Sequence, residues 1–244
     1  MTILSVNINK IATLRNARGE NYPNLLNTAK DIINFGAQGI TIHPRPDERH
    51  IRYQDAIDLK DNISCELNIE GNPINKFIEL VNRVKPAQVT LVPDSEDAIT
   101  SNSGWDTVTN YSFLKDIVDD FKSNSIRVSI FIDPHIKMVE GAKKINADRI
   151  ELFTGPYAKE YISDRDKAID KYVKCSEVAN EIGIEINAGH DLNQNNLKFF
   201  SDSVNNIKEV SIGHALITES LYNGFEPTIK SYLEILKGKF FIQT

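Results

Sequence analysis

The sequence contains only two cysteines and no long apolar run. Cys65 and Cys175 lie far apart, with no CxxC pair and no Cys/His spacing typical of a metal site, so we expect two reduced thiols in a cytoplasmic protein. No apolar stretch approaches the ~20 residues that a membrane span needs. The first ten residues alternate like a strand and lack the apolar core of a signal peptide. We therefore expect neither a disulfide, a membrane segment nor export.

Basic residues are not in excess, and no segment has the composition of a linker. The chain has 28 Lys and Arg residues against 34 Asp and Glu residues, a formal net charge of -6. This balance argues against a general nucleic-acid-binding protein, because such proteins carry a basic surface. Without a low-complexity segment or linker, the 244 residues are predicted to form one domain, 1–244.

Short segments rich in isoleucine and valine alternate with helical patterns along the whole chain. Apolar residues recur at helical spacing within 74–84 and within 113–121. Each of these helical patterns lies between two of the isoleucine- and valine-rich segments. Alternation of strand and helix indicates parallel strands joined by crossover helices. The eight expected strands are 3–8, 39–43, 65–70, 88–92, 127–132, 149–153, 184–188 and 208–212.

Eight strand–helix units in 244 residues predict an α/β protein with the closed (β/α)8 (TIM) barrel fold, which typically takes ~250 residues. A doubly wound open sheet is the competing architecture. It would normally carry a GxGxxG turn after its first strand, where this chain has Asn-Ile-Asn-Lys (7–10). We therefore favour the barrel.

Two connections between the expected strands are unusually long. The polar connection 94–111 follows the fourth strand and is interpreted as an active-site lid, with a solvated surface insertion as the alternative. The connection 155–170 contains two tyrosines and alternating charges. It is expected to hold an extra helix that caps the same face or makes a subunit contact.

All five histidines lie at or just beyond the carboxyl end of an expected strand. In parallel α/β proteins these ends converge on one face, where ligands bind. Histidine can give or take a proton near neutral pH. The histidines therefore predict an active site on that face; they are His43, His50, His135, His190 and His214.

Other polar side chains are expected at the same barrel mouth. Each alone could be a satisfied structural group, but a barrel interior is expected to hold branched apolar residues. Carboxylates buried near imidazoles cost energy, so their joint placement indicates catalysis. These side chains are Asn7, Asn9, Glu70, Asp133, Glu151 and Asn187.

Two regions have the chemistry of an anion site. The first is a set of arginines, which bind phosphate in bidentate fashion, although Arg49 and Arg52 could be ordinary surface charges. The second contains Gly189 and Gly213, where backbone N–H groups can approach an anion after strands seven and eight, the usual phosphate site of this fold. Two regions suggest two phosphorylated substrates. The arginines of the first region are Arg15, Arg18, Arg45, Arg49 and Arg52.

Seven segments, in order along nearly the whole chain, form a set of motifs that is specific as a whole and not singly. They are Val-Asn-Ile-Asn-Lys-Ile-Ala-Thr-Leu-Arg-Asn-Ala-Arg-Gly (6–19), Gly-Ile-Thr-Ile-His-Pro-Arg-Pro-Asp-Glu-Arg-His-Ile (39–51), Leu-Asn-Ile-Glu-Gly-Asn (67–72), Gln-Val-Thr-Leu-Val-Pro (88–93), Val-Ser-Ile-Phe-Ile-Asp (128–133), Glu-Ile-Asn-Ala-Gly-His-Asp-Leu (185–192) and Ser-Ile-Gly-His-Ala (211–215). Together they resemble the pyridoxine 5′-phosphate synthase family of the deoxyxylulose-dependent vitamin B6 pathway.

The resemblance implies a (β/α)8 barrel with extra helices, assembled as a homo-octamer. It implies condensation of 1-deoxy-D-xylulose 5-phosphate with 3-amino-2-oxopropyl phosphate to pyridoxine 5′-phosphate, inorganic phosphate and water. This transferase chemistry would proceed by multi-step acid–base catalysis. The resemblance implies no metal and no organic cofactor. The net charge and the lack of a long apolar run predict neither a nucleic-acid nor a membrane partner.

The resemblance also implies roles for individual residues. His43 and Glu70 would be proton acceptors, His190 the proton donor and Glu151 a stabiliser of the transition state. His135 matches no position with a role in the family and is interpreted as structural. The amino-oxopropyl phosphate would be bound by Asn7, Arg18, Asp191, Gly213 and His214. The deoxyxylulose phosphate would be bound by Arg45, His50 and Thr100, the last inside the expected lid.

The chain departs from the family at Asn9-Lys10, where many members have Asp-His. The resemblance implies that this pair contacts the deoxyxylulose phosphate. Asn9 keeps the size of aspartate and loses its charge, while Lys10 replaces a titratable ring with a fixed cation. The departure leaves the proton-transfer residues unchanged and affects how that substrate is held.

Two other functions remain as alternatives. A sugar-phosphate isomerase or epimerase on the same barrel needs one phosphate site, and would leave the arginines between His43 and His50 unexplained. A non-catalytic barrel that binds phosphorylated metabolites predicts loss of the acid–base residues, whereas His43, Glu70 and His190 are all present.

Overall fold

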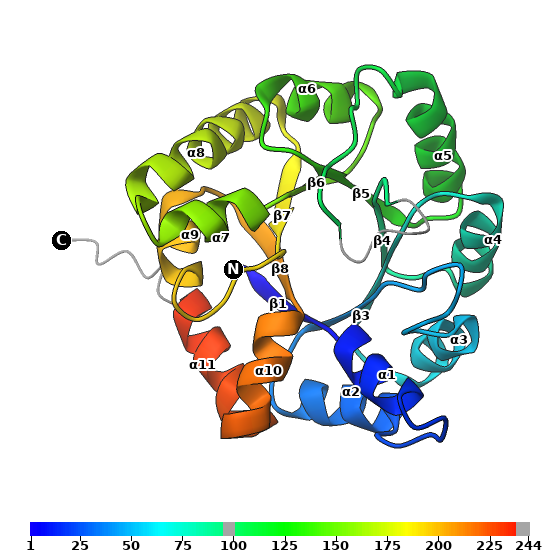
Figure 1. The fold of residues 1–244 in the computed structure, drawn as a ribbon. Coiled ribbons are helices and arrows are strands. Elements are labelled where there is room, and N and C mark those ends of the chain that lie inside the picture. Colours follow the sequence, from blue (N-terminus) through cyan, green and yellow to red (C-terminus); the bar gives the residue numbers. More distant parts are fainter. Residues whose placement is uncertain (95–100, 238–244) are drawn as a thin grey trace.

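The computed structural model describes residues 1–94 and 101–237. Eight parallel strands close into a barrel in chain order, with the last strand paired to the first (Figure 1). This confirms the (β/α)8 barrel, and each strand begins and ends within one residue of its expected bounds. The strands are β1 (Ile3–Asn7), β2 (Gly39–Ile42), β3 (Glu66–Gly71), β4 (Gln88–Leu91), β5 (Arg127–Ile132), β6 (Arg149–Leu152), β7 (Glu185–Ala188) and β8 (Ile207–Ile212).

The helices surround the barrel (Figure 1). Two helices, rather than one, follow β1, β6 and β8. The pair after β6 confirms an extra helix within 155–170. The helices of the described chain are α1 (Asn9–Asn16), α2 (Leu25–Asn34), α3 (Tyr53–Asn62), α4 (Asn75–Val84), α5 (Tyr111–Ser123), α6 (Ile136–Lys144), α7 (Gly155–Tyr161), α8 (Arg165–Ile182), α9 (Leu197–Ser203), α10 (His214–Asn223) and α11 (Phe225–Lys237).

The apolar core lies between the strands and the surrounding helices. Helix α4 buries Phe77, Leu80, Val81 and Val84, a spacing that places all four on one face. The strands contribute the alternate residues that point outward, such as Ile40 and Ile42 of β2. Thr41 between them points inward, and its Oγ1 lies 2.7 Å from Ser5 Oγ of the neighbouring β1. The outer layer thus carries the hydrophobic stabilisation.

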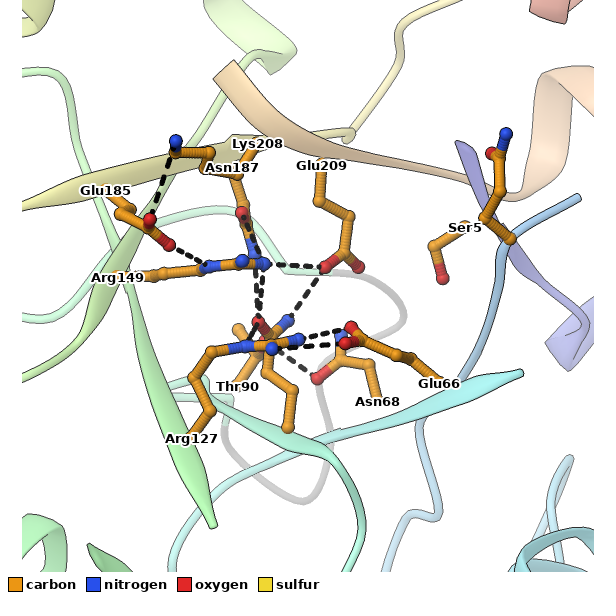
Figure 2. Close-up of polar contacts among 12 residues, drawn as sticks. Ser5, Glu66, Asn68, Thr90, Arg127, Arg149, Glu185, Asn187, Lys208 and Glu209 are labelled. Carbon is orange, nitrogen blue, oxygen red and sulfur yellow. Dashed lines mark hydrogen bonds and ion pairs between the residues drawn. The ribbon is translucent and has the colours of Figure 1, made fainter. Parts of the chain in front are cut away.

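The barrel interior is polar, which corrects the expectation of branched apolar residues there. Figure 2 shows side chains from β3 to β8 meeting across the barrel. Arg149 Nη1 donates to Gln88 Oε1 at 3.1 Å, and Thr90 Oγ1 donates to Asn68 Oδ1 at 3.1 Å. Buried polar groups are tolerated when they are hydrogen-bonded to one another, and these are.

The described part of the long connection after β4 is anchored to β5. Trp105 N donates to Phe131 O at 2.8 Å, and Gly104 N donates to Asp133 Oδ2 at 3.1 Å. A Cβ at Gly104 would lie 2.2 Å from Asp133 N, so this approach requires glycine. The segment therefore runs along the carboxyl end of β5, and its function as a lid stays a prediction. In residues 1–94 and 101–237, no helix combines the length and apolar character needed to cross a membrane.

Candidate active site

The carboxyl ends of the first four strands bring His43, Glu70 and Asn7 together. His43 Nδ1 lies 3.9 Å from Glu70 Oε2, and Asn7 Nδ2 donates to the same oxygen at 3.4 Å. His43 Nε2 lies 4.0 Å from Oδ2 of Asp94, a residue that the sequence analysis missed. Asp94 directly follows β4, so its place at a strand end was the available signal.

His43 is neutral at physiological pH. Burial, followed by the positive charge of Arg45, lowers the pKa of His43 to about 3. A neutral imidazole has a ring nitrogen that can accept a proton. The ring therefore has the protonation state that a proton acceptor requires.

Two carboxyl groups in the mouth have raised pKa values. Burial and the nearby Glu151 raise the pKa of Glu70 well above its usual value. Burial and the nearby Glu209 raise the pKa of Glu151 to about 8. Glu151 Oε2 has no hydrogen-bond partner among the described residues, although it is buried. Buried unpaired oxygens are uncommon, and this one can accept a hydrogen bond from a ligand in the mouth.

Asn9 joins the ends of β1 and β2. Its Oδ1 accepts from His43 N at 2.9 Å, and its own N–H donates to Asn7 Oδ1 at 3.1 Å. The amide at position 9 therefore fixes the backbone of a residue assigned to proton transfer. A contact of Asn9 with substrate stays a prediction.

A cluster of positive charge lies beside His43. Arg45 is buried, and its Nη2 lies 2.6 Å from Asp94 Oδ2. Burial and the charges of Lys10, Arg49 and Arg45 lower the pKa of His50. This cluster favours an anion, as predicted for this side. Thr100, also predicted there, lies outside the described residues.

Hydrogen bonds from α1 fix the loop that carries His50. Arg15 is 1% exposed and forms two hydrogen bonds to Asp55, at 2.7 and 2.9 Å. Its Nη2 and Asn16 Nδ2 both donate to His50 O, at 3.2 and 2.8 Å. The interpretation of Arg15 as an anion-binding group is therefore wrong, because Asp55 and the loop carbonyl occupy its guanidinium.

On the opposite side of the mouth, His190 follows β7. Its Nδ1 lies 3.2 Å from Asp191 Oδ2, and its ring meets the Phe153 ring edge-on with centroids 5.1 Å apart. The hydrogen bond from His190 lowers the pKa of Asp191, and the charge of His214 contributes. The Asp191 carboxylate therefore lies where it can orient the His190 ring for proton transfer.

The glycines after β7 and β8 allow close approach of the chain. A Cβ at Gly189 would lie 2.0 Å from Ser211 O, so glycine is required for the packing of β7 on β8. Gly213 caps the amino end of α10, where His214 is the first helical residue. A Cβ at Gly213 would lie 3.1 Å from Asn7 Cβ. The free N–H groups of a helix start favour an anion at this point.

The remaining predicted residues lie further from these groups. Asn187 is not at the mouth: it is buried inside the barrel, where its Nδ2 donates to Gln88 Oε1 at 3.4 Å. Arg18 is exposed in the turn after α1, and His135 is exposed at the start of α6. Arg52 Nη2 donates to Asn16 Oδ1 at 3.1 Å, a local contact of the His50 loop.

A closed barrel with imidazoles and carboxyl groups at its carboxyl end, between a cationic side and a helix amino end, defines the class of (β/α)8-barrel enzymes that work by acid–base chemistry. The family model described as "Pyridoxal phosphate biosynthesis protein PdxJ" matches residues 4–238. The chain belongs to this family.

Full-length relatives carry the name pyridoxine 5′-phosphate synthase. The one from Christiangramia forsetii is 58% identical over 237 residues, covering 97% of this chain and 100% of the relative. The one from Flavobacterium johnsoniae is 59% identical with the same coverage. Enzymatic activity in pyridoxine 5′-phosphate synthesis follows from this membership.

Solved structures with low identity share the fold alone. Phosphoribosylanthranilate isomerase from Thermotoga maritima superposes with a TM-score of 0.62 at 15% identity, over 98% of this chain and 100% of the other. A 3-keto-L-gulonate-6-phosphate decarboxylase from Vibrio cholerae superposes with a TM-score of 0.67 at 9% identity, over 97% of each chain. These matches support the barrel and say nothing of the reaction.

Proposed function

We propose that the chain condenses 1-deoxy-D-xylulose 5-phosphate with 3-amino-2-oxopropyl phosphate to form pyridoxine 5′-phosphate, inorganic phosphate and water. The observation that carries this reaction is the meeting of His43 with Glu70 in a mouth that also holds Glu151. Joining an amine to a ketone, expelling water and phosphate, and closing an aromatic ring needs several proton transfers at different atoms. One group cannot reach them all, so acids and bases around a mouth suit the task.

The two phosphates would bind on opposite sides of the mouth. The cations Lys10 and Arg45, together with His50 and Thr100, would hold the deoxyxylulose phosphate. Fixed cations stabilise the phosphate as it leaves. The amino end of α10, at Gly213 and His214, would hold the other phosphate, with further contacts from Asn7, Arg18 and Asp191. Holding both substrates by their phosphates aligns the reacting carbons.

The proton transfers would be divided among four side chains. His43, neutral because of its lowered pKa, and Glu70 would accept protons, and His190, paired with Asp191, would donate one. Glu151, with its unpaired oxygen, would stabilise the charged transition state. We propose that these groups act without a metal or organic cofactor.

The protein would work as a cytoplasmic homo-octamer. Large apolar side chains are exposed on the additional helices: Ile162 just after α7, and Leu221 and Tyr222 on α10, are 90%, 73% and 92% exposed. Exposed apolar groups of this size are typical of contacts between subunits. This exposure supports self-association.

The direct test is product formation by the purified protein. The two phosphorylated substrates, incubated with the protein and a metal chelator, are expected to give pyridoxine 5′-phosphate and inorganic phosphate in equal amounts. Absence of product with both substrates verified intact would reject the assignment. Conversion of a single sugar phosphate without its partner would instead favour the isomerase alternative.

His190→Asn is expected to lower kcat by about 10²-fold or more, because a general acid is lost. Substrate binding should change little, since the phosphate contacts remain. Steady-state kinetics with both substrates measures this. His135→Asn is the matched control, because His135 is also at a strand end but is exposed and has no assigned role. Equal kcat values for His190→Asn and the unaltered protein would remove His190 from the catalytic set.

Lys10→His is expected to change the KM for deoxyxylulose phosphate more than kcat. It restores at position 10 the residue common in the family and replaces a fixed cation close to His50. Lys30→His, at an exposed position of α2, is the control. If kcat changed and KM did not, Lys10 would take part in chemistry rather than in holding substrate.

A further inference from the structure

A third carboxyl group, Glu209 of β8, lies inside the barrel with the two carboxyl groups of the mouth. Glu209 is 3% exposed and Glu151 is 5% exposed, and the Glu70 side chain is 13% exposed. None of the roles described above uses Glu209. Figure 2 shows it pointing into the interior toward Arg149.

The strand register places Glu209 close to Glu151. Glu151 of β6 pairs with Asn187 of β7, and Asn187 pairs with Glu209 of β8. All three side chains point into the barrel. Asn187 of β7 therefore lies between Glu151 of β6 and Glu209 of β8 at this level of the barrel. Adjacent strands lie ~4.8 Å apart, which puts the backbones of the two glutamates roughly 10 Å from each other. Side chains that point toward a common axis approach more closely than that.

Of these three carboxyl groups, Glu209 is the one with a cationic partner in direct contact. Its Oε2 lies 3.2 Å from Arg149 Nη1 and accepts from Gln88 Nε2 at 3.2 Å. Gln88 is itself fixed, because its Oε1 accepts from Arg127 Nε at 2.9 Å. Negative charge inside the barrel is therefore best stabilised on Glu209.

The other two carboxyl groups lack such partners. Glu151 Oε2 has no hydrogen-bond partner among the described residues, and Glu70 Oε2 has the Asn7 amide at 3.4 Å and the neutral His43 ring at 3.9 Å. A buried carboxyl group without a cation is more stable when it is protonated. A fixed negative charge nearby adds to that preference.

We propose that Glu209 is a positioning residue whose anchored negative charge keeps a proton on the Glu70–Glu151 pair of the substrate-free enzyme at neutral pH. The inference rests on the function proposed above, because that function assigns Glu70 and Glu151 to the reaction. With one proton shared between Glu70 and Glu151, the pair does not carry two negative charges. It can also give that proton to an intermediate of the reaction.

The surrounding charges are consistent with this role. Burial and Glu209 raise the pKa of Glu151, and Glu209 is also among the charges that raise the pKa of Glu70, after burial and Glu151 and before Asp94. Burial raises the pKa of Glu209 too, while Arg149 and Arg127 oppose that shift. The titratable and charged groups that face these carboxyl groups from the neighbouring strands are His43 after β2, Glu66 of β3, Asp94 after β4, Arg127 of β5, Arg149 of β6 and Glu185 of β7.

The test is an infrared titration of the substrate-free protein, which follows the absorption of protonated carboxyl groups. In the unaltered protein we expect this band to persist at pH 7 and to weaken at higher pH, as pH rises through the raised pKa of Glu151. In Glu209→Gln the loss should move to lower pH by about one unit, the size expected for a unit charge ~10 Å away in a partly screened interior. The alkaline limb of the kcat profile, where the pair loses this proton, should move in the same direction.

Two further variants separate this role from a general effect on packing. Glu185→Gln removes another carboxylate bonded to Arg149, but one whose side chain is 44% exposed, and should leave the titration unmoved. Asn187→Asp adds a negative charge between Glu151 and Glu209 and should move it to higher pH. A structural role alone would not give shifts of opposite sign.

Three results would overturn the proposal. The first is the absence of a protonated carboxyl band at pH 7 in the unaltered protein. The second is an unmoved titration in Glu209→Gln, and the third is an equal shift in Glu185→Gln. If Glu209→Gln does not fold, the unaltered protein and Asn187→Asp decide the question. The titration needs no substrate, so its outcome is independent of whether the proposed reaction occurs.

Discussion

Glu70→Gln is expected to lower kcat by about 10³–10⁴-fold, the upper part of the range for loss of a general acid–base group. Glu70 is largely enclosed, with its side chain 13% exposed, so solvent cannot replace the lost carboxyl group. The amide has the same shape and can still receive the hydrogen bond from Asn7. Steady-state kinetics with both substrates measures the loss.

The thermal stability of Glu70→Gln shows whether its lower kcat comes from the lost carboxyl group or from unfolding. Burial raises the pKa of Glu70 above its value in the unfolded chain, so the folded state binds more protons and loses stability as pH rises. A neutral amide removes this penalty, and Glu70→Gln should unfold at the same temperature as the unaltered protein at pH 7, or higher. Glu66→Gln, at the other end of β3, is the control and should keep kcat within about twofold. A kcat of Glu70→Gln close to that of Glu66→Gln would exclude Glu70 from the chemistry.

Arg15→Met is expected to destabilise the protein by about 3–5 kcal/mol, the usual cost of breaking a buried ion pair from one side. Arg15 is 1% exposed, and Asp55 would be left with an uncompensated charge. For a chain of this size the melting temperature should fall by roughly 6–20 °C. Thermal unfolding measures this, and the loss of the bond to His50 O should also raise the KM for deoxyxylulose phosphate.

A double variant distinguishes the charge from the packing. Arg15→Met with Asp55→Asn removes both charges and keeps an oxygen to accept from Arg52 N at the start of α3, where Asp55 Oδ2 accepts at 2.7 Å. It should regain much of the lost stability. Arg165→Met, which breaks an exposed pair with Asp166, should change the unfolding free energy by less than about 1 kcal/mol. Similar losses of unfolding free energy in all three variants would show that the buried Arg15–Asp55 pair contributes no more than an exposed pair.

The fold was predictable because its elements have strong local patterns. Each strand is a short segment with branched apolar residues, and the helices between them have apolar faces with clear three- and four-residue spacing. Parallel topology then places every strand end on one face, which is why His43 and Glu70, 27 positions apart, could be expected in the same mouth. The expectation of two anion-binding sides rests on the same topology.

The polar interior was not predicted, although the strands contain a pattern that indicates it. Strands covered on both faces usually read as continuous apolar runs. Here polar residues alternate with apolar ones, as in Glu-Leu-Asn-Ile-Glu (66–70) and Arg-Ile-Glu-Leu (149–152). This alternation places the polar residues on the inner face, but it cannot say which of them pair. The link between Arg149 and Glu209 spans 60 positions and depends on barrel closure.

The misassignment of Arg15 has a similar cause. An arginine after the first strand can face the mouth or turn back beneath the loop, and local sequence does not distinguish the two. Its partner Asp55 is 40 positions away, in the first turn of α3. Only the packing of α1 against the loop before α3 decides its role.

We propose that one barrel mouth holds both phosphates apart and carries out the proton transfers between them. The most direct test is a crystal structure of the protein with pyridoxine 5′-phosphate and inorganic phosphate bound. We expect the phosphate of the product at Gly213 and His214, and inorganic phosphate beside Arg45 and His50. The ring between them should lie within about 3 Å of a Glu70 oxygen or the His43 ring. Both phosphates on one side of the mouth, or a ring beyond hydrogen-bond reach of these groups, would contradict it.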